Sequence, residues 1–156
     1  MALWRLYYHL VWATKERQPL ITREREGKLY GYIISKADEL GTIIHAIDGI
    51  ENHIHLVASI PPKISISDFV QKIKGSSTHY INHLSPGEDT FGWQRGYGVF
   101  SLGRKQLEQA VIYVKNQKEH HSNGTTIASL EEHNQDDDAP TKFYLSQPPG
   151  NEFSVS

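Results

Sequence analysis

The sequence predicts an α+β, ferredoxin-like fold (split βαβ, RRM-like), in which an antiparallel sheet is followed by an appended C-terminal helix. Four segments rich in β-branched or alternating apolar residues are typical of strands, and segments with apolar residues at helical spacing separate them. The resulting order is βαββαβ, followed by a helix that runs to Asn123 and Gly124. A chain of 156 residues is long enough to bury one core without disulfides.

The first predicted strand covers residues 4–14, WRLYYHLVWAT, which are dense in aromatic and β-branched side chains. The first helix follows it. Thr22 can cap the start of this helix, and Gly41 can end it. Between them, apolar residues recur at helical spacing at Leu29, Ile33, Ala37 and Leu40.

A hairpin of two strands is predicted next. Its strands are the stretch TIIHAI, residues 42–47, and the stretch HIHLVASI, residues 53–60. We expect the turn around Asp48 and Gly49, and we expect Pro61 and Pro62 to end the second strand.

The second half of the domain contains a helix, a strand and a final helix. The first of these helices is predicted to begin near Ser67, with a buried stripe made of Phe69, Ile73, Tyr80 and Leu84. Residues 93–102, WQRGYGVFSL, are predicted as the fourth strand. The final helix is predicted to run without a break from Arg104 to Asn123, with a core face of Leu107, Val111 and Val114.

Charge divides the chain into two parts. From Ile127 onward there are six acidic residues and one basic residue, whereas residues 1–126 contain fifteen basic and twelve acidic residues. We therefore expect one folded domain at residues 1–124 and a poorly ordered acidic tail at residues 125–156. The mildly basic domain is compatible with a polyanionic partner.

Composition excludes several classes of site. The chain has no cysteine, which excludes disulfides, zinc–thiolate sites and thiol nucleophiles and suits a reducing compartment such as the cytoplasm. The apolar N-terminus is interrupted by Arg5, His9 and Lys15, so we expect neither a signal peptide nor a membrane span there.

Two histidines lie one residue apart in the third predicted strand. Because side chains alternate along a strand, His53 and His55 share one face while Ile54 and Leu56 point to the other. Two imidazoles at this spacing can bind one metal ion and leave its other positions open to a substrate oxygen. The alternative interpretation is that both are ordinary polar residues on a solvated strand face.

A second group of candidate residues lies on the final helix, beside its core face: Gln106, Tyr113, Gln117 and His120. Tyr113 and Gln117 are one turn apart, so they are neighbours. The amide oxygen of Gln117 could be a third metal ligand. A tyrosine is a known covalent nucleophile, but with an ordinary pKa near 10 it requires an activated electrophile. The alternative is that both residues only mark the margin of an amphipathic helix.

The motif NHIHLV, followed about sixty residues later by YVKNQ, resembles the single-tyrosine HUH transposases of the insertion-sequence 200/605 type. The opening YYHLVWATKERQPLI is similar to that family as well, so the resemblance covers roughly residues 4–122. It implies that Tyr113 attacks a DNA phosphodiester and forms a 5′-phosphotyrosine link. It also implies that His53, His55 and Gln117 hold Mg²⁺ or Mn²⁺, although imidazole ligands alone would favour Zn, Ni or Cu.

The resemblance also implies partners. The expected substrate is single-stranded DNA with hairpins near the ends of the mobile element, and the expected enzyme is a homodimer whose sites are shared between subunits. Leu102 and Gly103, directly before the final helix, would then be the joint about which that helix crosses to the partner.

Residues expected to contact DNA are basic and lie outside the apolar stripes: Lys15, Arg17, Arg23, Lys72, Lys74, Arg95 and Arg104. Trp93 could stack on an unpaired base. The other tyrosines weighed as nucleophiles, Tyr7, Tyr8 and Tyr80, lack a helical glutamine four residues on. His120 and His121 could assist proton transfer or contact phosphate, but we interpret them as partners of the helix dipole and leave them out of the catalytic residues.

Three other functions are compatible with parts of this pattern. A replication initiator or relaxase-type nickase uses the same chemistry but generally carries further domains. A non-catalytic single-strand nucleic-acid-binding module is compatible with the sheet, although its usual aromatic residues are replaced here by histidines. A histidine-triad phosphate transferase would require a third alternating histidine, which HIHLV lacks.

Overall fold

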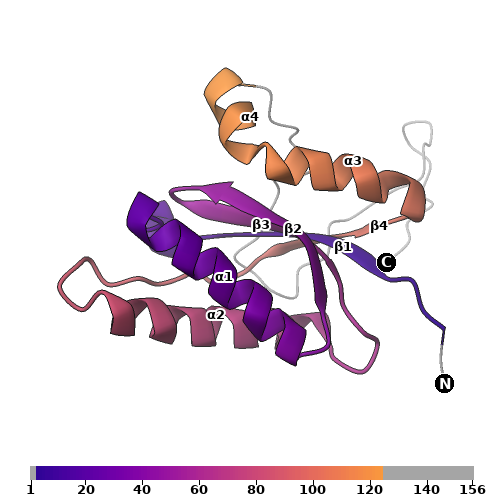
Figure 1. Ribbon diagram of the computed structural model, residues 1–156, viewed down its shortest axis with the longest axis horizontal. Coiled ribbons are helices and arrows are strands. Elements are labelled where there is room, and N and C mark those ends of the chain that lie inside the picture. Colours follow the sequence, from indigo (N-terminus) through magenta and orange to yellow (C-terminus); the bar gives the residue numbers. More distant parts are fainter. Residues whose placement is uncertain (1–2, 125–156) are drawn as a thin grey trace, which may run out of the picture.

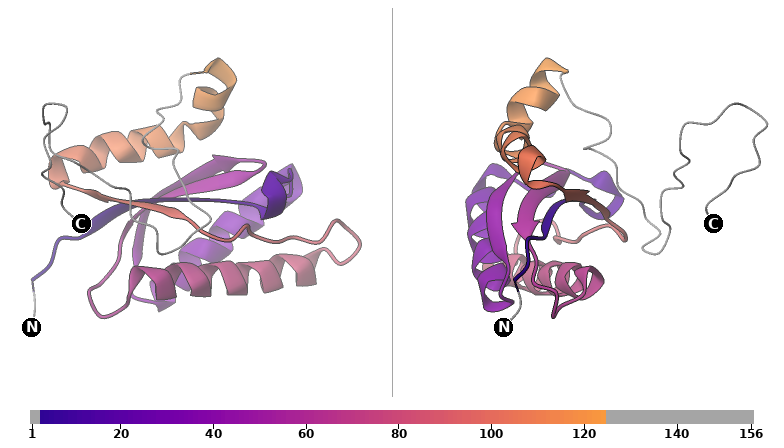
Figure 2. Two further views of the ribbon diagram at one scale, coloured as in Figure 1. Left: turned by 180° about the vertical axis from the view of Figure 1, so that it is seen from behind. Right: turned by 90° about the vertical axis from the view of Figure 1, so that its right-hand side faces the viewer.

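The computed structural model describes residues 3–124, which form one antiparallel sheet with helices on both faces (Figure 1). The strands are β1 (Tyr7–Ala13), β2 (Ile43–Ile50), β3 (His53–Ser59) and β4 (Gly98–Leu102), in the order β2-β3-β1-β4. The helices α1 (Arg23–Glu39) and α2 (Ile66–Leu84) cover one face. Two helices, α3 (Arg104–Lys115) and α4 (Gln117–Asn123), cover the other, as the view from behind also shows (Figure 2).

This arrangement confirms the predicted ferredoxin-like plan with an appended C-terminal segment. A short 3-10 helix, η1 (Lys15–Arg17), follows β1. The predicted acidic tail at residues 125–156 lies outside the described residues. Within residues 3–124, every helix is too short or too polar to cross a membrane.

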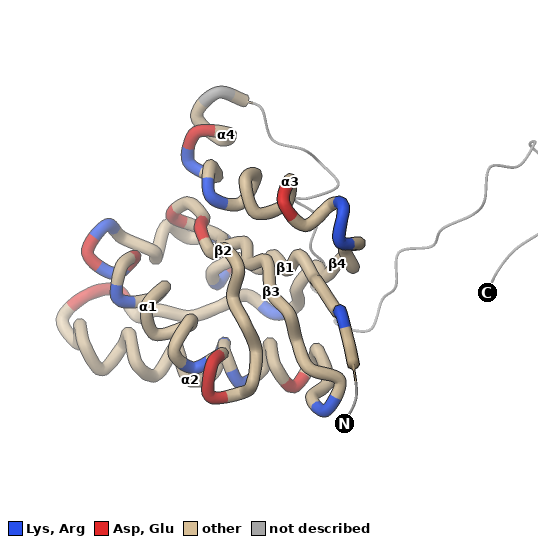
Figure 3. The backbone as a smooth tube through the Cα atoms, turned by 45° about the vertical axis from the view of Figure 1, so that its right-hand side comes forward, with Lys and Arg blue, Asp and Glu red and all other residues tan. Residues whose placement is uncertain are grey.

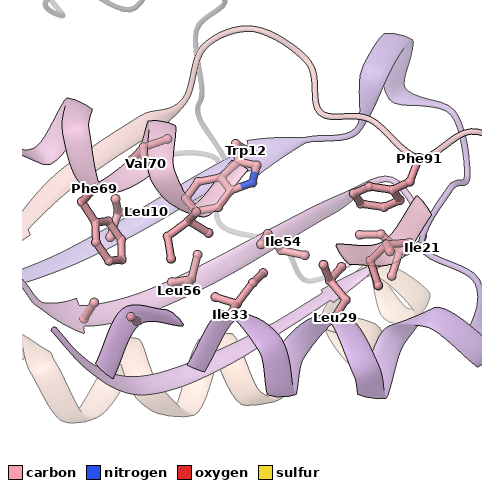
Figure 4. Packing of buried hydrophobic residues seen from close by; sticks show 14 of the residues in the cluster. Leu10, Trp12, Ile21, Leu29, Ile33, Ile54, Leu56, Phe69, Val70 and Phe91 are labelled. Carbon is pink, nitrogen blue, oxygen red and sulfur yellow. The ribbon is translucent and has the colours of Figure 1, made fainter. Parts of the chain in front are cut away.

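The main core lies between the sheet and the pair α1 and α2 (Figure 4). Strand alternation sends Leu10 and Trp12 of β1, and Ile54 and Leu56 of β3, to this face. Apolar residues at helical spacing meet them there, including Leu29, Ile33, Phe69 and Val70. The same alternation directs His53 and His55 to the opposite face.

Both helices of this layer are capped by a hydroxyl. Thr22 accepts from the backbone amide of Arg25 at the start of α1, as predicted. At α2 the cap is Ser65, which accepts from the amide of Asp68, and the helix begins at Ile66, next to the predicted Ser67.

The predicted buried stripe of α2 is wrong in its second half. Phe69 and Ile73 are buried, but the i, i+4 series then continues through Ser77 and Ile81. As a result Tyr80 is only partly buried and Leu84 is 43% exposed.

The β2–β3 turn lies at Glu51 and Asn52, not around Asp48 and Gly49 as predicted. Asp48 pairs with His55 inside the ladder, and Gly49 pairs with Ile54. A Cβ at position 49 would overlap the backbone oxygen of His53. Gly49 is therefore required by close strand packing and not by a turn.

The predicted fourth strand is shorter than residues 93–102, because β4 begins at Gly98. The side chain of Lys74 donates hydrogen bonds to the backbone oxygens of Gln94 and Gly96, at 3.0 and 2.6 Å. Gly96 has a φ of 92°, which bends the chain there. These two carbonyls accept from Lys74 instead of from a neighbouring strand, so the pairing of β4 with β1 starts only at Gly98.

Candidate active site

The face of the sheet that α3 covers carries three buried histidines. His53 is 2% exposed, and His55 and His9 are 0% exposed. The interpretation of the pair as ordinary residues on a solvated strand face is therefore wrong, because helix α3 packs over this face through Val57, Ala110 and Val114. The last of these belongs to the predicted core face of the helix.

Each histidine of the pair has a short contact through Nδ1. His53 Nδ1 lies 2.8 Å from Oδ1 of Asn52, and His55 Nδ1 lies 2.8 Å from Nε2 of His9. Nε2 of His53 lies 3.1 Å from Nε2 of His121, which belongs to α4. Buried polar groups are thus paired with one another. Strand and helix patterns do not reveal the pairs His9–His55 and His53–His121, because their members are far apart in the sequence.

A break between α3 and α4 brings the second half of this cluster into place. A single helix to Asn123 was predicted, but α3 ends at Lys115 and Asn116 has φ −111° and ψ 26°. The amide of the Asn116 side chain donates to the backbone oxygen of Ile112 at 3.0 Å, a contact by which asparagine competes with helical continuation. Helix α4 then leaves α3 at an angle (Figure 1).

Gln117 and His121 lie one turn apart on α4; His121 contacts His53, and Gln117 contacts His121. Gln117 is 0% exposed, and its Oε1 lies 3.1 Å from Nε2 of His121. The ligand atoms of His53, His55 and His121 all lie within 4.8 Å of one another. From the sequence, His121 was interpreted as a partner of the helix dipole and left out of the site, whereas the structure places it in this cluster. Its spacing of four residues from Gln117 was the signal that could have identified it.

Lys118 attaches α4 to the rest of the domain. Its ammonium lies 2.7 Å from Glu26 of α1 and 2.9 Å from Asp48 of β2, and it donates to the backbone oxygen of Gly49 at 3.2 Å. Burial lowers the pKa of Lys118, but the hydrogen bonds and charges of the two carboxylates outweigh burial, so the pKa is raised. Sequence reasoning missed this residue because its partners are distant in the chain.

Tyr113 lies beside the histidine pair in the same chain. Its side chain is 5% exposed, its ring centroid is 6.2 Å from that of His55, and it stacks on His120 at 4.5 Å. It is therefore a buried part of the cluster rather than the margin of an amphipathic helix. The predicted neighbour Gln106 instead accepts a hydrogen bond from the backbone amide of Gly103 at the start of α3.

The rival tyrosines lie elsewhere. Tyr80 stacks on Tyr32 in the α1–α2 layer, with centroids 4.4 Å apart, and Tyr8 packs against the main core. Tyr7 packs on His45. It is the first residue of β1, whereas Ala13, at the other end of that strand, pairs with His53. Burial, and then the charges of Glu26 and Asp48, raise the pKa of Tyr30, so its phenol stays protonated.

The donor atoms of the cluster fit a divalent metal ion. Two imidazole nitrogens bound to one tetrahedral ion lie about 3.3 Å apart, close to the 3.1 Å between Nε2 of His53 and Nε2 of His121. The Gln117 amide is buried, and its Nε2 has no hydrogen-bond partner among the described residues. Three imidazoles give a set richer in nitrogen than the predicted two histidines and one amide, and such a set favours transition metals over magnesium.

The basic residues predicted to contact DNA fall into three places and do not form one surface. Figure 3 shows that lysines and arginines are spread over several elements. Lys15, Arg17 and Arg23 lie at the end of the sheet that carries His53, since the amide of Thr14 donates to the backbone oxygen of Asn52. Three others lie on α2 and in the loop after it, namely Lys72, Lys74 and Arg95.

The remaining candidate contacts are less favourable. Arg104 begins α3 at the end of the sheet away from His53, and Lys74 holds the loop described above. Trp93 is not a free stacking surface, because its indole donates to Ser77 and packs against Trp12 and Phe91.

A cavity of about 460 Å³ opens beside the cluster. It lies between the start of α1, the β2–β3 turn and α4, and its lining includes Arg23, Glu51, Lys118 and His121. It offers space next to the candidate metal ligands, and its wall carries both basic and acidic groups.

The chain is similar in sequence to known transposases. Residues 2–117 match the family model described as transposase IS200 like. The chain is 30% identical over 132 residues to the transposase for insertion sequence element IS200 of Salmonella typhimurium, covering 80% of this chain and 85% of that protein. It is 25% identical over 120 residues to the ISDra2 transposase TnpA of Deinococcus radiodurans, covering 74% of this chain and 86% of that protein.

Two solved structures share the fold. A proposed transposase from Deinococcus radiodurans R1 aligns with a TM-score of 0.59 at 28% identity, over 74% of this chain and 93% of that one. A REP-associated tyrosine transposase bound to a REP hairpin aligns with a TM-score of 0.58 at 17% identity, over 81% of this chain and 76% of that one. The second likeness concerns the fold alone.

Proposed function

This chain belongs to the IS200-like transposase family, and we propose that it cleaves and rejoins single-stranded DNA with Tyr113 as the nucleophile. The observation that carries this proposal is the meeting of Tyr113 with His53, His55, Gln117 and His121 on one face of the sheet. These residues come from β3, α3 and α4.

The proposed reaction is a transesterification. The hydroxyl oxygen of Tyr113 attacks the phosphorus of a DNA phosphodiester, and the bond to the 3′-oxygen breaks. The tyrosine loses its proton, the leaving 3′-oxygen gains one, and a 5′-phosphotyrosine link remains. A 3′-hydroxyl of another strand reverses the step and rejoins the DNA, so no external energy source is required.

His53, His55 and Gln117 are the proposed metal ligands, and His121 lies in the same cluster. A divalent ion bound there supplies Lewis-acid polarisation of the scissile phosphate. We retain Mg²⁺ or Mn²⁺ as the implied ions, with Mn²⁺ favoured by the nitrogen-rich donor set.

The proposed substrate carries hairpins near the ends of the mobile element, as the resemblance implies and as a relative of the same fold was solved with a REP hairpin. Lys15, Arg17 and Arg23 are the basic residues best placed to hold phosphates, because they lie at the His53 end of the sheet. We propose residues 1–124 as the transposase domain, in the cytoplasm.

A homodimer with shared sites remains a proposal. Within one chain, Tyr113 already lies beside its own His55. The joint proposed at Gly103 has no conformational need for glycine, since its φ is −77°. Exchange of α3 between subunits would therefore depend on how α3 packs against the partner, and not on backbone conformations that only glycine can adopt.

Incubation of labelled single-stranded element ends with protein and Mn²⁺, followed by denaturing electrophoresis, tests the proposed function. We expect a covalent protein–DNA band that Tyr113→Phe abolishes and that the control Tyr80→Phe retains. A band that persists in Tyr113→Phe would contradict the assignment of the nucleophile. Retention of DNA without any covalent band would instead favour a non-catalytic binding module.

A further inference from the structure

His9 of β1 is a buried residue that the proposed reaction does not use. Its Nε2 lies 2.8 Å from Nδ1 of His55, and both residues are 0% exposed. The two rings are nearly parallel, with an interplanar angle of 14° and centroids 5.0 Å apart. On its other side the His9 ring packs against Phe100 of β4, with centroids 6.1 Å apart.

The antiparallel register of β1 and β3 creates this contact. Val11 lies opposite His55, and His9 lies opposite Val57, so the two histidines are diagonal neighbours on one face. Long or aromatic side chains reach each other across such a diagonal. The contact is therefore built into the central strand pair of the sheet.

We propose that His9 is a positioning residue that holds the proton of His55 on Nδ1, so that Nε2 of His55 is the metal-binding atom. The inference rests on the metal site proposed above. A neutral imidazole has one donor nitrogen and one acceptor nitrogen. If His55 Nδ1 donates to His9, the lone pair of His55 lies on Nε2. With the reverse assignment Nε2 carries the proton and cannot bind an ion.

His53 has the same arrangement with a different partner. Its Nδ1 lies 2.8 Å from Oδ1 of Asn52, and an amide oxygen only accepts, so His53 Nδ1 donates. Its Nε2 is the nitrogen that approaches His121. Metal-binding histidines generally donate their second N–H to a partner that fixes ring orientation. Asn52 and His9 occupy this position for His53 and His55 respectively.

The contact between His55 and His9 differs from that between His53 and Asn52, because the imidazole of His9 accepts or donates according to its own tautomer. His9 accepts at Nε2 only when its own proton is on Nδ1. Two tautomers are thus coupled across the β1–β3 pair, and loss of the acceptor would release the proton of His55. A purely structural role of His9 would require only a flat ring against Phe100.

Two substitutions separate these roles. His9→Phe keeps a flat ring for Phe100 but removes the acceptor, and His9→Gln restores an acceptor with its amide oxygen. His45→Phe is the matched control. His45 lies on β2 and contacts Oγ of Ser59 at 2.7 Å, so its loss removes a similar hydrogen bond that involves neither His53 nor His55.

The first readout is the histidine side-chain nitrogen spectrum of the metal-free, full-length protein, measured by NMR near pH 8, above the ordinary histidine pKa of about 6.5. We expect His55 to be protonated on Nδ1 in the wild type and in His9→Gln. In His9→Phe we expect it to move toward the Nε2-protonated form. A wild-type His55 protonated on Nε2 would overturn the proposal.

The second readout is the affinity for Mn²⁺, measured by calorimetry together with the melting temperature. His9→Phe should weaken binding by about 10–100-fold, as is typical for partners of metal ligands, while His9→Gln and His45→Phe stay near the wild type. Equal affinity in wild type and His9→Phe, at equal melting temperature, would overturn the proposal. A wild type that binds no divalent ion would refute the metal site itself, and the nitrogen spectrum would still decide the role of His9.

Discussion

The two faces of the sheet differ in what they bury. Among the described residues, sixteen buried apolar side chains form the cluster under α1 and α2, and four form the cluster under α3. The α3 face instead buries polar groups, including His9, His53, His55 and Gln117. Most of the apolar surface that stabilises the domain is therefore buried on the α1–α2 face.

This difference separates stability from chemistry. A buried polar group is costly unless it is paired, and the α3 face pairs its histidines with Asn52, with His121 and with one another. Such a network requires defined geometry, which the large apolar core on the opposite face can support. Neighbouring residues of β3 should consequently respond to substitution in opposite ways.

The largest expected effect is the loss of metal-dependent cleavage in His55→Ala. We expect a decrease of more than about 100-fold, since even the partners of metal ligands typically account for about 10–100-fold. Chelation of the metal should have the same effect on the wild type. His45→Ala, on the same face but away from the cluster, should retain activity, and unchanged cleavage in His55→Ala would show that the histidine pair is not used.

The next effect concerns the adjacent residue on the other face. Leu56→Ala should lower the free energy of unfolding by about 2–5 kcal/mol, the range for a buried leucine in a packed core. Its affinity for Mn²⁺, measured well below the melting temperature, should stay near the wild type. Chemical denaturation and calorimetry measure the two quantities, and equal losses of both would remove the distinction between the faces.

Mixed dimers test whether the α3 face is completed by one chain or by two. If α3 is exchanged, a one-to-one mixture of Tyr113→Phe and His53→Ala should recover about a quarter of wild-type cleavage, because half of the randomly formed dimers contain one intact site of two. Each variant alone should be inactive. Confirmed subunit exchange without recovered cleavage would contradict sharing and leave the one-chain geometry described above.

The smallest expected effect is that of Lys118→Met, which removes the contact of α4 with Glu26 and Asp48. The Lys118 side chain is 52% exposed, so the loss of stability should be no more than about 1 kcal/mol. Hydrogen exchange in α4 should become faster, and affinity for Mn²⁺ should fall a few-fold. Lys115→Met, at the exposed end of α3, is the control.

The pH dependence of this contact follows from the raised pKa of Lys118. Its contribution to stability is fully present below the ordinary lysine pKa of 10.5 and is lost as the pH rises through the higher folded-state pKa. The difference between wild type and Lys118→Met should therefore be constant near neutral pH and disappear only in strong alkali. A difference that already vanishes near pH 7 would contradict the ion pair.

Periodic features of the candidate site were predictable from the sequence. A period of two places His53 and His55 on one face and Ile54 and Leu56 on the other, and both assignments are confirmed. A spacing of four predicted Tyr113 and Gln117 as neighbours on one helix, but the break at Asn116 places them on α3 and α4; both are buried. Only the strand assignment therefore follows from backbone geometry that repeats along one element.

Tertiary structure alone decided the contacts between distant elements. His9 and His55 are 46 residues apart, His53 and His121 are 68 apart, and Lys118 and Glu26 are 92 apart. No local period relates such residues, because strand register and helix docking set their distances. The direction of α4 after the break at Asn116 belongs here too, since it decides whether His121 reaches the pair. The sequence by itself determined which side chains each element presents, and packing decided which of them meet.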